Sequence, residues 1–177
     1  MTPSQTSVAD PVAPRVLVVD DEEIVLVALR ETLRRAGYEV VAVSNPKEAL
    51  VLLTEQSFSV ILTDQQMPGM TGLEFLERVR QLQPHAVRIL ISAVLSLNTL
   101  IEAINKGEVF RFLIIPWMRE DLLAAVKDAL ERYELMGRHA ALRAELQAKE
   151  DLIQRLTARL ASGRDPSAGP ESPEPRA

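Results

Sequence analysis

Five short apolar runs, each followed by a longer amphipathic segment, constrain the fold of this chain more than any other feature. The first run, 15–19, is too short and too uniformly apolar for a surface helix, so it predicts a buried parallel strand. Residues 22–36 then carry a helical pattern of apolar side chains, formed by Ile24, Val25, Ala28, Leu29 and Leu33. Gly37 stands where a left-handed residue is expected to end that helix.

The same alternation repeats along the chain as far as residue 118 and beyond. We expect further strands at 38–43, 58–63, 86–91 and 109–114, and helices at 46–56, 71–82, 97–106 and from 118 onward. Short connections and right-handed crossovers favour an α/β fold with a doubly wound, five-stranded parallel sheet. Ligands bind such sheets at the carboxyl ends of the strands, so the residues that follow each strand are the first candidates for a site.

Composition excludes several classes of chemistry and location. The 177 residues include no cysteine and two histidines, which removes disulfides and thiolate catalysis and disfavours histidine-based metal sites. The net charge of −5 offers no general attraction to nucleic acid. The chain has no apolar run of the roughly 20 residues that a membrane helix needs, and its first residues lack the pattern of a signal peptide. We therefore expect a cytoplasmic protein that binds neither nucleic acid nor membrane.

Acidic side chains gather at the predicted carboxyl ends of two strands. Asp20 and Asp21 follow the first strand, and Asp64 follows the third. Three like charges at one sheet edge repel one another unless a cation lies between them, and Mg²⁺ prefers such oxygen ligands. The alternative is that Asp20 and Asp21 only cap the first helix.

Three motifs occur in order on the predicted strands. They are Val18-Val19-Asp20-Asp21-Glu22, then Leu62-Thr63-Asp64 followed by Met67-Pro68-Gly69-Met70-Thr71-Gly72, and Ile91-Ser92-Ala93. Over residues 15–136 the chain thereby resembles the receiver domain of bacterial two-component response regulators. The resemblance implies a flavodoxin-like (βα)5 fold, cytoplasmic phosphorelay signalling and a histidine kinase or phosphotransfer protein as partner. It implies no enzyme activity beyond self-catalysed phosphotransfer.

The resemblance also assigns roles to individual residues. Asp64 is the expected phosphoryl acceptor, and Ser92 is expected to contact a phosphoryl oxygen. The implied Mg²⁺ ligands are the carboxylates of Asp20, Asp21 and Asp64 and the main-chain carbonyl of Gln66. Phe112 resembles the aromatic residue that switches rotamer in this family. Ordinary alternatives are a turn or helix cap for Ser92 and core packing for Phe112.

Residues 68–74 contain two signals that predict local structure rather than chemistry. Pro68 and Gly69 are typical of a turn that leads the chain away from Asp64. Thr71 and Glu74 have the spacing of a capping box at the start of the third helix.

One position departs from the receiver pattern. Ile115, which precedes Pro116, stands where the family has a lysine. An apolar side chain cannot supply the charge-assisted contact that a lysine makes with Asp64 and with a phosphoryl group. Two interpretations stay open: an active acceptor whose coupling to the rest of the domain is weakened, or a scaffold that works without phosphorylation. The resemblance also predicts a cis bond before Pro116.

A helical pattern continues beyond the predicted domain. Apolar residues at alternating steps of four and three over 137–161 predict a coiled-coil extension, with His139 and Lys149 as polar positions in the seam. We expect a coiled-coil partner or a homodimer, and a solitary solvated helix is the alternative. Residues 137–177 are too few and too polar to build an enzymatic or DNA-binding output domain. The proline-rich ends, 1–14 and 162–177, are predicted to be disordered.

Overall fold

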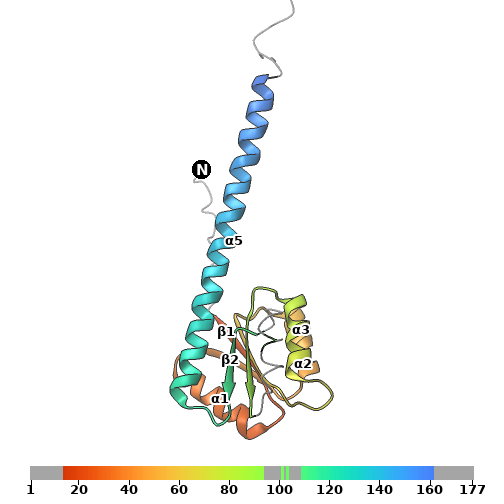
Figure 1. Cartoon of the computed structure of the whole chain (residues 1–177), viewed down its shortest axis with the longest axis vertical. Helices are drawn as coiled ribbons and strands as arrows, with labels where there is room; N and C mark the ends of the chain where they lie inside the picture. The colour runs from red at the N-terminus through yellow and green to blue at the C-terminus, as the bar shows by residue number, and fades with distance from the viewer. Residues whose placement is uncertain (1–13, 94–100, 102, 104–108, 162–177) are drawn as a thin grey trace, which may run out of the picture. The chain divides into compact units, whose positions relative to one another are not determined.

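A parallel five-stranded sheet forms the centre of the receiver-like region. The computed structural model describes residues 14–93, 101, 103 and 109–161 (Figure 1). Its strands stand in the order β2-β1-β3-β4-β5. The strands are β1 (Arg15–Val19), β2 (Glu39–Val43), β3 (Val60–Asp64), β4 (Val87–Ser92) and β5 (Arg111–Ile114). Every pair of neighbours is parallel, so the flavodoxin-like, doubly wound fold predicted from the sequence is confirmed.

Helices connect the strands and cover both faces of the sheet. The described helices are α1 (Glu23–Arg35), α2 (Pro46–Glu55), α3 (Gly72–Leu82) and α5 (Arg119–Ala161). The expected helix at 97–106 lies outside the described residues except at positions 101 and 103. The ends of β3 and β4 come one residue later than expected. Asp64 and Ser92 are therefore the last residues of their strands.

Side chains that alternate along the strands build two apolar clusters, one on each face. On the first face, Val16, Val18, Leu62 and Ile89 pack with residues of α1 and of the first turns of α5. On the second face the intervening residues, such as Leu17 and Ile61, pack with α2 and α3. Figure 1 shows the same division, with α1 and α5 on one side of the strands and α2 and α3 on the other.

The buried face of α1 agrees only in part with the one that the sequence pattern indicated. Ile24 is 85% exposed and Ala28 is exposed, whereas Leu26, Leu29 and Leu33 are buried. Leu29 and Leu33 were predicted, and Leu26 keeps a helical period with them just as the exposed residues do, so the period alone could not decide which further residues face the sheet. Ile101, which lies within the helix expected at 97–106, is exposed.

Local signals at the helix ends act as the sequence predicted. Gly37 has a φ of +91°, and its N–H donates to the carbonyl of Arg34 at 2.9 Å, which closes the end of α1. Thr71 and Glu74 form the predicted capping box, with bonds of 3.3 Å and 2.9 Å between side chain and main chain. Gly69, with a φ of +78°, makes the turn before it.

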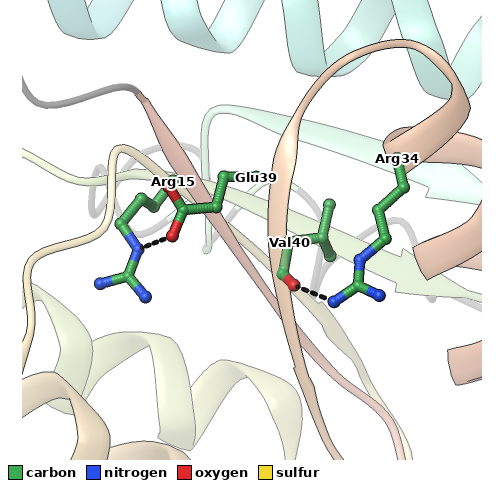
Figure 2. A network of polar contacts seen from close by, with 4 residues as sticks. All are labelled: Arg15, Arg34, Glu39 and Val40. Atoms are coloured by element: carbon green, nitrogen blue, oxygen red, sulfur yellow. Dashed lines mark hydrogen bonds and ion pairs between the residues drawn. The ribbon is translucent and has the colours of Figure 1, made fainter.

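Two polar contacts tie β2 to its neighbours (Figure 2). Arg15 and Glu39 are register partners on β1 and β2, and Nε of Arg15 donates to Oε1 of Glu39 at 2.6 Å. Arg34 of α1 donates to the main-chain carbonyl of Val40 at 3.2 Å. The edge strand is thereby linked both to the strand beside it and to the helix that leads into it (Figure 2).

The chain divides into two compact units, with the boundary after Gly137. In the first unit, α5 buries Leu122, Ala125, Val126, Ala129 and Leu130. In the second unit the helix continues to Ala161, and every residue from Arg138 to Ala161 is exposed. None of the helices within the described residues is long and apolar enough to cross a membrane.

Candidate functional site

Asp20 and Asp64 come from neighbouring strands at the same edge of the sheet. In the register of β1 with β3, Val19 pairs with Thr63, so the next residue of each chain segment is an aspartate. Asp20 is only 3% exposed, and its Oδ1 accepts a hydrogen bond from the N–H of Glu22 at 2.9 Å. Strand pairing therefore brings together two of the three aspartates predicted to converge at this edge.

Burial and nearby charge make Asp20 an unusual acid. The pKa of Asp20 is raised from 3.8 to about 6, mainly by burial and against the lowering effect of its hydrogen bond from Glu22. The carboxylates of Asp64, Asp21 and Glu22 contribute smaller parts of the same rise. A bound cation stabilises the ionised form of a carboxyl group in such surroundings, because it offsets both the lost hydration and the neighbouring negative charge.

The carboxylate of Asp64 is oriented by the loop that follows it. Asp64 is partly exposed, and its Oδ2 accepts a hydrogen bond from the N–H of Gln66 at 2.5 Å. Gln66 itself is exposed at the surface. This bond fixes one carboxylate oxygen and directs the turn that carries the chain toward α3.

Gly72 is a site residue that sequence analysis named only as part of a motif. Its N–H donates to the carbonyl of Gln65 at 3.0 Å. A Cβ at this position would lie 2.7 Å from Cδ1 of Leu90 and even closer to the carbonyl oxygen of Asp64. A glycine directly after a capping threonine was the available signal for this close approach.

Asp21 is exposed, in contrast to Asp20. The N-cap of α1 is Glu22, whose own side chain makes no capping hydrogen bond, so neither aspartate is the N-cap residue, although Asp20 accepts a hydrogen bond from the N–H of Glu22. Within the described part of the chain, no group of three or more His, Cys, Asp or Glu side chains is arranged to hold a metal ion. The predicted ligand set of Asp20, Asp21, Asp64 and Gln66 therefore stays a prediction.

Ser92 lies at the end of β4, the strand next to Asp64. It is 2% exposed, and its carbonyl accepts a hydrogen bond from the N–H of Ile115 at 3.0 Å. On β5, Phe112 pairs with Leu90 and is partly buried against the cluster that α2 and α3 cover. Ser92 is thus near the carboxylate edge, and Phe112 has the packing contacts of a core residue.

Ile115 contributes packing where the receiver pattern has a charge. Its side chain is partly buried and lies against the apolar cluster that α1 and α5 cover. The Ile115–Pro116 peptide bond is cis, as predicted. The segment after β5 therefore has the expected main-chain conformation and lacks a cation at this position.

Comparison with known proteins decides which family this fold and acidic edge belong to. The sequence model described as "Response regulator receiver domain" matches residues 16–127. The chain belongs to the response regulator receiver domain family. This receiver domain is a module of two-component signalling, and such domains are signalling modules rather than enzymes.

The relatives of this receiver domain include longer regulators and single domains. The hydrogenase transcriptional regulatory protein HoxA of Cupriavidus necator is 40% identical over 83% of this chain, which spans 30% of HoxA. A CheY-like receiver domain protein from Methanospirillum hungatei superposes with a TM-score of 0.66 at 29% identity. That superposition covers 70% of this chain and 98% of the other. The receiver domain of an HD domain-containing protein from Pseudomonas fluorescens has a TM-score of 0.68 at 30% identity, over 75% and 98% of the two chains.

Proposed function

We propose that this receiver domain accepts a phosphoryl group on Asp64 from a histidine kinase or a phosphotransfer protein. The observation that supports the proposal most directly is the buried carboxyl group of Asp20 beside Asp64. The pKa of Asp20 is raised mainly by burial and in smaller part by the neighbouring carboxylates. Burial beside other carboxylates destabilises a charged aspartate, so it is an unfavourable arrangement for a purely structural residue. The same arrangement favours the binding of a cation and a phosphoryl group. The signal then passes through protein contacts in the cytoplasm.

Mg²⁺ fits the donors at this edge. Two neighbouring carboxylates, those of Asp20 and Asp64, together with the main-chain carbonyl of Gln66 and water, are the oxygen ligands that Mg²⁺ accepts. We assign to Asp21, which is exposed, a contact with the ion either directly or through water. When bound, the ion neutralises charge on the phosphoryl oxygens during transfer.

The transfer itself needs one correctly oriented carboxylate. The hydrogen bond from Gln66 holds Oδ2 of Asp64, and we assign the attack on phosphorus to Oδ1. A new O–P bond replaces the P–N bond of the donor's phosphohistidine, and the electron pair of the broken bond stays on the imidazole nitrogen, which takes up a proton. The chain's contribution is position and charge, which is why no catalytic base is required.

The response to phosphorylation is expected to begin at Ser92. Its hydroxyl lies on the strand beside β3, and donation to a phosphoryl oxygen would draw the end of β4 toward Asp64. Phe112 is the second residue that we expect to respond. It is the register partner of Leu90, which lies on β4 two residues before Ser92. Without a lysine at 115, Ser92 is the main side chain that couples the phosphoryl group to the fold.

A scaffold that works without phosphorylation is the second candidate, and Ile115 favours it. The side chain at this position packs into the apolar cluster and offers no charge to a phosphoryl group. In that function the receiver fold and the helical extension serve only to bring other proteins together.

Incubation with Mg²⁺ and acetyl phosphate distinguishes the two candidates. We expect the intact mass to rise by one phosphoryl group, and the rise to be lost in Asp64→Asn and retained in Asp151→Asn, an exposed aspartate on the extension. A mass unchanged under these conditions, together with no shift of the melting temperature by Mg²⁺, would support the scaffold and exclude the phosphoacceptor.

A further inference from the structure

The second unit presents an apolar stripe on a fully exposed helix. Leu142, Leu146, Ile153, Leu156 and Leu160 are all large, apolar and exposed. With His139 and Lys149 they follow alternating steps of four and three, which places them on one side of the helix as a coiled-coil seam. A contiguous exposed stripe of this kind marks an interface with another helix.

A parallel pairing of two copies brings like charges together. With His139, Leu146, Ile153 and Leu160 at the a positions, the flanking g and e positions pair Arg138 with Arg143 of the second copy. They also pair Glu145 with Glu150 of the second copy. Both contacts are repulsive and both occur twice, so charge disfavours the parallel arrangement.

An antiparallel pairing centred on Asp151 changes each of these contacts. Its core layers join Leu142 to Leu160, Leu146 to Leu156 and Lys149 to Ile153, each pair from different copies. Beside the core, antiparallel helices pair g with g, which sets Glu145 against Arg159 of the second copy. The two repulsive contacts, each of which occurs twice, are thereby replaced by an attractive contact that occurs twice and a single like-charge contact between the two Glu150 residues.

Three further residues agree with this centre. Leu152, which is exposed and lies beside the seam, meets Leu152 of the second copy and so gains an apolar neighbour. His139 lies outside the outermost core pair, Leu142 with Leu160, and has no core partner on the second helix. Lys149 is therefore the one polar residue within the paired part of the seam. Lys149, which binds Glu145 of its own helix at 2.6 Å, lies near the two Glu150 carboxylates at the centre and offsets their charge.

We propose that residues 138–161 pair with the same segment of a second copy as an antiparallel coiled coil centred on Asp151. The occupant of the exposed seam is thus a second copy of this chain. In this arrangement the two Gly137 residues lie roughly 40 Å apart along the coil, at 1.5 Å per residue, instead of side by side. The two receiver domains are joined to opposite ends of the coil.

Disulfide trapping tests the orientation, because the natural chain contains no cysteine. In the full chain, Leu152→Cys is expected to form a disulfide-linked dimer under mild oxidation, since only the antiparallel pairing brings two residues 152 together. The matched variant Leu142→Cys is expected to stay unlinked, because it would be linked only in a parallel, in-register pair. Linkage of Leu142→Cys alone would overturn the proposal, as would a monomer by light scattering or an absence of linkage in both variants.

Charge substitutions provide an independent test. We expect Glu145→Arg and Arg159→Glu each to raise the dissociation constant of the dimer roughly fivefold, an effect of this size because the pair occurs twice. The double variant is expected to return the constant to its original value. Arg155→Glu makes the same charge change on the outer side of the helix and is expected to leave the constant unchanged. A parallel dimer would instead be tightened by Glu145→Arg, and binding only to a different protein would leave the purified chain monomeric. Either result would overturn the proposal.

Discussion

Gly72 packs directly against the main chain of Asp64, with its N–H bonded to the carbonyl of Gln65 at 3.0 Å. This contact joins the start of α3 to the end of β3, so the residue proposed to accept the phosphoryl group is held by its own loop. The position of Asp64 therefore depends on Gly72 having no side chain.

Gly72→Ala is expected to destabilise the fold by about 1–3 kcal/mol, because the added methyl group meets rigid main-chain atoms. Urea unfolding measures the change. Gly137→Ala is the matched control: nothing lies within 4 Å of a Cβ there, and alanine favours the helix, so stability should stay equal or rise. If Gly72→Ala were as stable as the natural chain, the loop between Asp64 and residue 72 would be able to accommodate a methyl group without loss of stability.

The capping box predicts a pH dependence in the acid range. Hydrogen bonds from the main chain and side chain of Thr71 lower the pKa of Glu74 below its ordinary value of 4.5. A lowered pKa means that the contribution of Glu74 to stability is present above pH 4.5 and is lost as the pH falls through the pKa in the folded state. We expect Glu74→Ala to lower the melting temperature at pH 7 and to change it less at acid pH. Glu77→Ala, which removes an exposed glutamate of the same helix outside the capping box, is the matched control and should lower the melting temperature less at pH 7.

Asp20 is expected to destabilise the metal-free fold at neutral pH. Its pKa of about 6 lies above 3.8, so the folded chain binds the proton more tightly than the unfolded chain, and stability falls as the pH rises through that interval. In EDTA at pH 8, Asp20→Asn should therefore melt at a higher temperature than the natural chain, with the difference vanishing below pH 4.

Addition of Mg²⁺ should raise the melting temperature of the natural chain, because the ion binds only the folded state. The shift should be lost in Asp20→Asn and retained in Asp151→Asn. An equal shift in all three proteins would place the binding of the ion elsewhere.

Ile115→Lys tests how much the missing cation limits the response. The lysine would remove apolar packing from the cluster under α1 and α5, at a cost of about 1 kcal/mol, and would restore the charge that the receiver pattern has at this position. We expect larger phosphorylation-dependent NMR shifts of the amides around Ser92 than in the natural chain. Ile115→Met, which keeps an apolar side chain, should leave these shifts unchanged. If lysine and methionine behaved alike, residue 115 would have no part in the coupling.

Patterns that depend on nearby residues were readable from the sequence. The alternation of strands and helices, the left-handed Gly37 and the capping box of Thr71 and Glu74 all follow from contacts within a few residues. The acidic edge was readable as well, because parallel strands place their carboxyl ends together. The exposed seam beyond Gly137 belongs to the same class, since an isolated helix keeps its local period.

Features that depend on distant neighbours were decided by the tertiary structure. Ile24 and Leu26 are both apolar and both helical, and only packing on the sheet selects Leu26 for burial. Asp20 and Asp21 are adjacent and chemically identical, yet Asp20 is buried with a raised pKa while Asp21 is exposed. The physical reason is that secondary structure follows from local spacing, whereas desolvation and close packing are set by residues that come together only when the chain folds.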